Sequence, residues 1–142
     1  MATTLLQHAK NILTEGNYTC VAYCAEQTLT STSRGVAPLL GWLEEGKDLS
    51  DFVVADKVVG KAAAFLHVLL GTNQLVAGTI SRSALQVLQN SGVYVDCDKV
   101  VDAIINRAGD GYCPLEQAVW DETSPTKALQ KIKEKLAELQ RK

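Results

Sequence analysis

The chain has 142 residues, of which 46% are hydrophobic and 21% are charged, a composition typical of one globular domain. Its formal net charge of -2 argues against a nucleic-acid-binding surface, which needs a clustered excess of lysine and arginine. No apolar run is long enough to cross a bilayer, and the N-terminus lacks the pattern of a signal peptide. We therefore expect a cytoplasmic protein that has neither a nucleic acid nor a membrane as its partner.

The N-terminal half alternates between helical and extended patterns. Apolar residues at helical spacing fill the first segment, and two β-prone runs, YTCVAYC and QTLTSTS, follow with only two residues between them. These patterns predict, in chain order, a helix at 3–15, a hairpin of strands 18–24 and 27–33, a helix at 34–46, a strand at 51–56 and a helix at 57–70.

The C-terminal half repeats the alternation of strand and helix and ends in helices. Ser81, Asp98 and Ser124 are predicted N-caps, because each precedes a helical stripe. The predicted elements are a strand at 74–80, a helix at 81–92, a strand at 93–97 and helices at 98–109, 113–120 and 124–142.

The order of these elements predicts the fold class. Alternating strands and helices favour parallel strands with right-handed crossovers, and a hairpin at one edge makes the sheet mixed. We expect a three-layer α/β/α domain with about five strands in the order 2-1-3-4-5. Residues 1–122 would form this domain, and residues 123–142 an amphipathic helix packed on it.

The four cysteines are expected to be reduced thiols in the cytoplasm. No CxxC pair occurs, and Cys20, Cys24 and Cys97 lie in apolar strands, where cysteine usually acts as a small buried hydrophobe. The two histidines, His8 and His67, are isolated in predicted helices and are more typical of core or surface positions than of a metal site.

Two segments stand out, KVVGKAAAFLHVLLG (57–71) and TISRSALQVLQNSGV (79–93). They resemble the two zinc-binding elements of the cytidine-deaminase-like fold: the first is similar to the helix that opens with the H-A-E element, and the second to the strand and helix around P-C-x-x-C. The zinc ligands and the proton-transferring glutamate are absent, because the matching positions are Val58, Val59, Gly60 and Lys61, and Ile80, Ser81 and Ala84. We therefore expect no zinc, no other cofactor and no zinc-dependent deamination.

Three further phrases occur in this order: SRGVAPLL (33–40), VADKVVGKAAA (54–64) and INRAGDGYCPLEQAV (105–119). Through them the chain resembles more closely, over about residues 5–122, a family of short bacterial proteins known as domain of unknown function 1893. This resemblance implies a deaminase-like fold without the zinc site, and it brings no assigned reaction.

A small-ligand site is predicted where the parallel strands end and the helices begin. Ligands of open α/β sheets bind beyond the carboxyl ends of the strands, and helix N-termini favour anions. The predicted ligand-binding residues are Ser33, Arg34, Gly35, Asp56, Lys57, Gly60, Lys61 and Ser81. The alternative is structural: Asp56 would be an N-cap, and Lys57 and Lys61 would extend into solvent.

Cys113 is the candidate nucleophile, and Lys61 is the second candidate catalytic residue. Cys113 follows the glycine-rich stretch RAGDGY and precedes Pro114 at a predicted helix start, where a thiol ionises more readily. Glu116 stands at capping-box spacing from it. The alternative is a small residue in a tight turn.

Two classes of function follow. The first is a small-ligand protein, either a binding protein or an enzyme, whose ligand is anionic or nucleotide-like. The second is a catalytically inactive regulatory module that acts through a protein partner, and a homo-oligomer is compatible with both. Exposure of Trp42 and Trp120 would favour the second class.

Overall fold

The computed structural model describes residues 4–106 and 108–140. Its strands are β1 (Cys20–Tyr23), β2 (Thr28–Ser31), β3 (Val53–Val59), β4 (Gln74–Ser81) and β5 (Tyr94–Val101). Its helices are α1 (Leu5–Glu15), α2 (Ala37–Glu44), α3 (Lys61–Leu70), α4 (Arg82–Asn90), α5 (Pro114–Ala118) and α6 (Pro125–Gln140). The predicted helix ends at residue 3 and at 141–142 lie outside the described residues.

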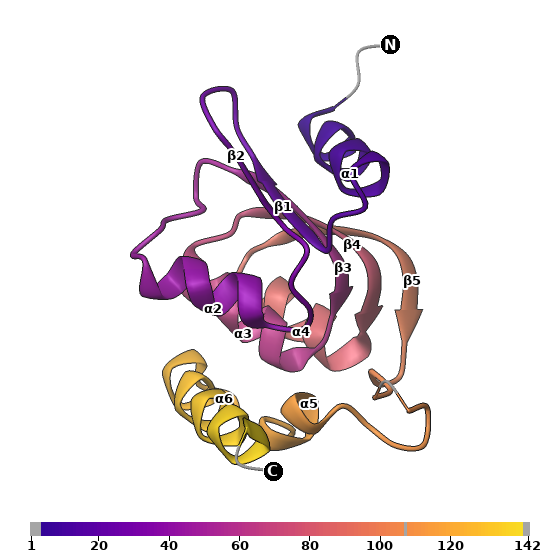
Figure 1. Ribbon diagram of the computed structural model, residues 1–142, viewed down its shortest axis with the longest axis vertical. Coiled ribbons are helices and arrows are strands. Elements are labelled where there is room, and N and C mark those ends of the chain that lie inside the picture. Colours follow the sequence, from indigo (N-terminus) through magenta and orange to yellow (C-terminus); the bar gives the residue numbers. More distant parts are fainter. Residues whose placement is uncertain (1–3, 107, 141–142) are drawn as a thin grey trace.

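The five strands form one mixed sheet with the order β2-β1-β3-β4-β5, which confirms the predicted order (Figure 1). β1 is antiparallel to both β2 and β3, whereas β3, β4 and β5 are parallel. The predicted hairpin is present, and backbone hydrogen bonds between Cys24 and Gln27 close its turn. Because β2 runs in the same direction as β3, the carboxyl ends of β2, β3, β4 and β5 share one edge of the sheet.

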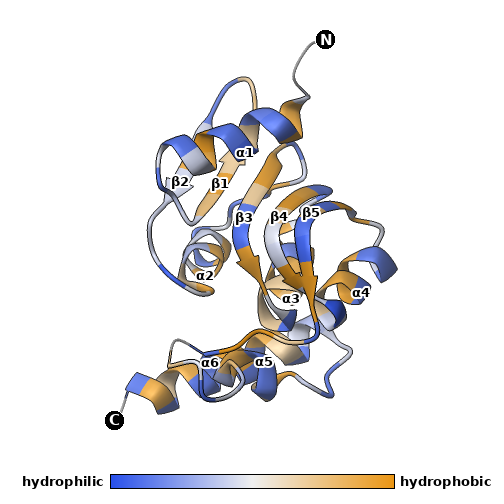
Figure 2. Ribbon diagram, turned by 90° about the vertical axis from the view of Figure 1, so that its right-hand side faces the viewer, coloured by the Kyte–Doolittle hydropathy of each residue, from blue (hydrophilic) through white to orange (hydrophobic). Residues whose placement is uncertain are grey.

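Helices cover both faces of this sheet, but unequally. On one face α1 buries Ala9 and Leu13 against Val21, Val53 and Ala55 and lies over β1, β3 and part of β4. The other face carries the larger core, to which α2, α3, α4 and α6 contribute (Figure 2). None of the helices in the described part of the chain has the length and apolar character needed to span a bilayer.

The boundary between β3 and α3 differs from the prediction. Residues 57–59 continue the strand, because Val58 and Val59 pair with Thr79 and Ile80 of β4. The helix begins only at Lys61, with Gly60 as its N-cap. The prediction that α3 starts at residue 57 is therefore wrong, and Asp56 and Lys57 are strand residues rather than helix-terminal ones.

The predicted helix at 98–109 is also wrong. β5 extends to Val101, because its backbone pairs with β4 as far as Ser81. The described residues between Val101 and α5 form a loop in which Ile105 bridges Tyr112. Asp98 is consequently an exposed strand residue and not an N-cap.

Candidate functional site

Glu116 forms the most connected polar contact at the carboxyl edge of the sheet. Its side chain is buried, and Oε2 accepts hydrogen bonds from the backbone N–H of Lys61 (2.8 Å) and the hydroxyl of Ser81 (2.6 Å). Oε1 accepts the backbone N–H of Ile104 (2.7 Å). One carboxylate on α5 therefore joins the starts of α3 and α4 to the loop after β5.

Gly60 permits this contact because it has no side chain. A Cβ at Gly60 would lie 3.1 Å from Oε2 of Glu116 and 3.2 Å from Cγ1 of Ile104, closer than ordinary van der Waals contact. The carboxylate thus occupies the position at the N-terminus of α3 where an anionic ligand would be attracted. The structure brings the predicted site residues Gly60, Lys61 and Ser81 together, but the Lys61 N–H and the Ser81 hydroxyl donate to a carboxylate of the protein itself.

The residues at the starts of α3 and α4 do not fit a zinc ion. The segments at the starts of α3 and α4 carry valine, glycine, lysine, isoleucine, serine and alanine, none of which supplies the thiolate or imidazole that zinc requires there. Within residues 4–106 and 108–140, no three histidine, cysteine, aspartate or glutamate side chains are grouped so that they could hold a metal ion.

The side chain of Lys61 turns away from Glu116 and towards the outside of the helical layer. Its ammonium donates to the backbone carbonyl of Trp120 (2.7 Å) and lies 5.8 Å from the centre of the Phe65 ring. No carboxylate in the described part of the chain forms an ion pair with it. Lys61 therefore presents a positive charge that no salt bridge within residues 4–106 and 108–140 neutralises.

This charge lies in a groove between α3, α4 and the turn that leads into α6. We call it the Lys61 groove; its cavity has a volume of about 290 Å³. Its lining includes Lys61, Phe65, Ser83, Gln86, Asn90 and Thr123. The side-chain amides of Gln86 and Asn90 have no hydrogen-bond partner among the described residues, so they are available to a ligand.

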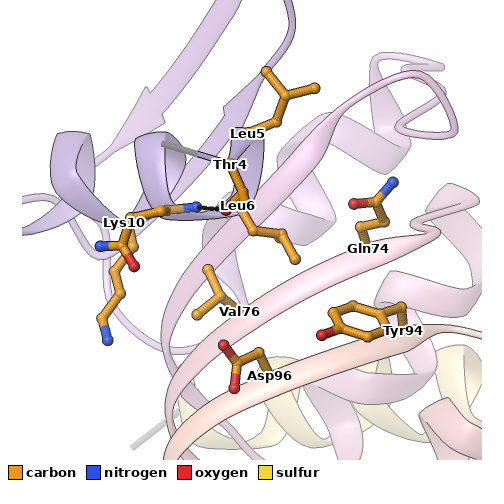
Figure 3. A pocket seen from close by; sticks show the side chains of 9 residues that line it. Thr4, Leu5, Leu6, Lys10, Gln74, Val76, Tyr94 and Asp96 are labelled. Carbon is orange, nitrogen blue, oxygen red and sulfur yellow. Dashed lines mark hydrogen bonds between the residues drawn. The ribbon is translucent and has the colours of Figure 1, made fainter. Parts of the chain in front are cut away.

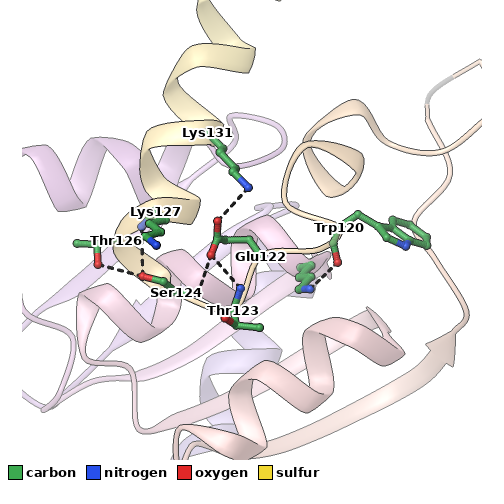
Figure 4. Close-up of polar contacts among 8 residues, drawn as sticks. Trp120, Glu122, Thr123, Ser124, Thr126, Lys127 and Lys131 are labelled. Atoms are coloured by element: carbon green, nitrogen blue, oxygen red, sulfur yellow. Dashed lines mark hydrogen bonds and ion pairs between the residues drawn. The ribbon is translucent and has the colours of Figure 1, made fainter.

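Glu122 also borders the groove, but its charge is compensated (Figure 4). Its carboxylate accepts the backbone N–H groups of Ser124 and Thr123, both at 3.0 Å, and pairs with the ammonium of Lys131 at 2.9 Å. The N–H of Ser124, followed by Lys131, lowers the pKa of Glu122 to about 2. Of the two charged residues in the lining, Lys61 is therefore the one whose charge is not compensated by an ion pair within the described residues, and it can bind an anion.

Asp56 lies in the core and not in the groove. Its carboxylate is 3.0 Å from Nε2 of the buried His67, and Nδ1 of that ring is 3.2 Å from the hydroxyl of Thr72. Burial, and secondarily the charge of Asp56, raises the pKa of the neighbouring Cys20 thiol well above its usual range. The three polar side chains satisfy one another beneath α3, which is typical of a structural contact.

Ser33, Arg34, Gly35 and Lys57 are all exposed, and none of them lines the Lys61 groove. Thr19 connects two of them, since its hydroxyl donates to the carbonyl of Ser33 and its carbonyl accepts the N–H of Lys57. These predicted residues therefore gather at the β2 side of the edge, whereas Gly60, Lys61 and Ser81 gather around Glu116.

Cys113 is the N-cap of α5 and is partly buried. The capping box with Glu116 does not form, because the Cys113 N–H bonds to the carbonyl of Ile104 (2.9 Å) and the Glu116 carboxylate points to α3 and α4. α5 has only five residues, so its N-terminal dipole is weak.

Comparison with known proteins identifies the family of the chain and a solved structure with a similar fold. A search of curated proteins found no match. The crystal structure of TM1506, a DUF1893 family protein from Thermotoga maritima, superposes with a TM-score of 0.87 and 24% sequence identity over 95% of this chain and 92% of that one. Residues 8–136 match the family described as a domain of unknown function, DUF1893. The chain therefore belongs to the DUF1893 family.

Proposed function

We propose that this protein binds a small anionic molecule, phosphate-bearing or nucleotide-like, in the Lys61 groove. The observation that carries the proposal is the ammonium of Lys61, which lies in a concave site without a carboxylate partner in the described part of the chain. A cation that is partly withdrawn from water attracts an anion more strongly than a fully solvated one.

The other groups of the groove support a polar ligand of modest size. Gln86 and Asn90 lie one helical turn apart on α4, so both amides face the same space. Phe65 supplies an apolar wall. A volume of about 290 Å³ is at the lower end of typical ligand pockets, which favours a small metabolite over a long polymer.

A deaminase-like origin of the fold is part of this proposal. It is supported by the strand order and by the two helices, α3 and α4, that begin at adjacent parallel strands. In this account Glu116 fills the former catalytic position with an internal carboxylate, and ligand binding is displaced to the outer side of α3. We then expect no zinc-dependent deamination, because these positions lack zinc ligands, and Cys113 would be the nucleophile if the protein is an enzyme.

A thermal-shift screen over nucleotides and sugar phosphates tests the proposal. A compound present at 100 times its dissociation constant stabilises the folded state by about 2.7 kcal/mol. For a chain of this length that corresponds to a rise in Tm of about 5–10 °C. The uncharged nucleosides are the matched controls, because they lack only the phosphate.

Two lysine variants locate the effect. Lys61→Met retains the aliphatic stem against Phe65 but removes the charge, and it should abolish the phosphate-dependent shift. Lys57→Met removes an exposed charge outside the groove and should leave the shift unchanged. A shift that persists in Lys61→Met and disappears in Lys57→Met would move the site to the β2 side of the sheet edge and overturn the proposal.

A second candidate function, a module that binds a protein partner, is favoured by an exposed aromatic cluster. Ile105, Tyr112 and Trp120 are 52%, 50% and 48% exposed, and the Tyr112 and Trp120 rings are 5.7 Å apart. Trp42, by contrast, is buried in the core. Sedimentation equilibrium of the wild type and of Trp120→Ser tests whether a second copy is that partner: self-association that the substitution removes would favour it.

A further inference from the structure

A second cavity lies on the opposite face of the sheet, where α1 leaves β5 uncovered. The α1 cavity, as we call it, has a volume of about 430 Å³ and lies between the first turns of α1 and the strands β4 and β5 (Figure 3). Val76 is the buried floor, and Leu5 and Leu6 form the wall on the helix side. The cavity therefore has an apolar floor and opens to solvent above it.

The strand register places a ring and a carboxylate side by side over this floor. Tyr94 and Asp96 are two residues apart on β5 and so point to the same face, about 7 Å from each other along the strand. Gln74 and Val76 are their partners on β4. Figure 3 shows the side chains of Tyr94, Asp96 and Gln74 around the same space.

Asp96 differs from the neighbouring aspartates because no basic group among the residues that the structure describes neutralises it. Asp98 pairs with Lys10, and Asp102 pairs with Arg82 at 2.8 Å. Asp96 accepts only the backbone N–H of Cys97 (2.9 Å), and no ion pair involves it within the described residues. Lys10, the sole cation among the described residues that line the cavity, is already bound to Asp98.

Some of the other polar groups of the cavity have hydrogen-bond partners within the protein, and others have none among the described residues. Thr4 caps α1 and Gln7 donates to Asn11, whereas the Tyr94 hydroxyl and the Gln74 amide have no hydrogen-bond partner in the described part of the chain. The free groups are thus one carboxylate, one phenol and one amide above an apolar floor. Their complement is a positively charged hydrogen-bond donor joined to an apolar body.

We propose that the α1 cavity binds a small organic cation, an amine carried on an apolar or aromatic body, with Asp96 as its counter-ion and Tyr94 against the apolar part. The ring of Tyr94 adds a cation–π contribution when the ammonium passes over its face. The site is separated from the Lys61 groove by the sheet itself, so it goes beyond the proposed function and is independent of it.

Titration followed by ¹H–¹⁵N correlation NMR tests this site with three probes of matched size. Phenethylamine carries the cation, 3-phenylpropionate replaces it by an anion, and 2-phenylethanol is uncharged. We expect phenethylamine to shift the amides of 74–76 and 94–96 with saturation, and the other two probes to bind at least tenfold more weakly. Similar shifts with 3-phenylpropionate, or no saturable shift with phenethylamine, would overturn the proposal.

Two variants identify the carboxylate that is responsible. Asp96→Asn keeps an acceptor for the Cys97 N–H and should weaken phenethylamine binding at least tenfold. Asp102→Asn removes a carboxylate that lies outside the cavity and should leave binding unchanged. An unchanged affinity in Asp96→Asn contradicts the assignment. Tyr94→Ala distinguishes the contribution of the Tyr94 ring from that of the Asp96 charge. It should weaken the binding of phenethylamine more than the binding of butylamine, which has no ring.

Discussion

Glu116 acts at the residue scale as an internal anion for two helices. Its carboxylate accepts the N–H of Lys61 at the start of α3 and the hydroxyl of Ser81, which itself caps α4. A buried carboxylate is tolerated only when donors surround it, and here three are present. The contact therefore fixes α5 and its preceding loop against the sheet edge.

Replacing this carboxylate by an amide should destabilise the fold. In Glu116→Gln the new NH₂ group meets N–H and O–H donors, so at least one buried donor loses its acceptor. We expect the free energy of unfolding to fall by about 1–3 kcal/mol, measured by urea denaturation. Glu134→Gln, an exposed change on α6, is the control and should have an effect within about 0.5 kcal/mol. Equal stability of the two variants would show that the Glu116 contacts do not hold the edge together.

The sequence predicted part of this arrangement. Gly60, Lys61 and Ser81 could be placed together because parallel strands bring their carboxyl ends to one edge. Glu116 could not, because it lies 55 residues after Lys61 and reaches it only through the loop that follows β5. Asp56 was assigned to the site because its strand was predicted to end there, whereas the strand continues and its side chain meets His67.

Cys113 remains the thiol that we expect to react first with iodoacetamide. It follows a glycine-rich stretch and is partly buried, whereas Cys20 is fully buried and burial raises its pKa. Peptide mapping after limited alkylation of the native protein should find Cys113 labelled several-fold faster than the other three. Faster labelling of Cys24 or Cys97, which are also partly buried, would assign Cys113 a structural role. The hypothesis that the protein is an enzyme would then lose its candidate nucleophile.

At the scale of elements, sequence patterns predicted which segments are regular better than where they end. The hairpin, β4 and the amphipathic helices α4 and α6 were recovered, because their periodicity is strong. β3 and β5 both extend further than predicted, through Val58–Val59 and Val100–Val101. In each strand, pairing with β4 and the β-propensity of valine outweigh the helix start that the sequence pattern predicts at a charged residue, Lys57 in β3 and Asp98 in β5.

The polar face of α4 contains the sequence signal for the Lys61 groove. Ser83, Gln86 and Asn90 recur at spacings of three and four, opposite the buried Ala84 and Leu88. Such a stripe is normally only a solvated face. It becomes part of a groove here because the turn before α6 lies beside it, and that packing is not visible in a local pattern.

The start of α6 should confer a pH-dependent stability through Glu122. Its pKa falls from about 4.5 to about 2 on folding, so its stabilising contribution is present above pH 4.5 and is lost as the pH drops towards 2. Chemical denaturation of the wild type and Glu122→Gln should therefore show a difference that is largest near neutral pH and shrinks over that range. Glu138→Gln, which removes an exposed carboxylate of α6, is the control. A difference that is independent of pH would contradict this assignment.

At the scale of the whole molecule, the unequal helical layers produce two separate cavities. The face with α2, α3, α4 and α6 closes into a large core and leaves the Lys61 groove at its outer side. The face with α1 alone leaves part of β4 and β5 open and forms the α1 cavity. Within the described residues, Lys61 in the groove and Asp96 in the α1 cavity form no ion pair, so opposite ligand charges are expected on the two faces.

The central claim, that an anion binds in the Lys61 groove, is tested most directly by mapping where a phosphate compound binds. The measurement is a ¹H–¹⁵N NMR titration of the wild type with adenosine 5′-monophosphate and with ribose 5-phosphate, and adenosine serves as the uncharged control. We predict saturable shifts at Lys61 and Phe65, along 83–90 and at Thr123, which depend on the phosphate and are lost in Lys61→Met. Shifts confined to 33–35 and Lys57, or no phosphate-dependent shift with either compound, would contradict the account.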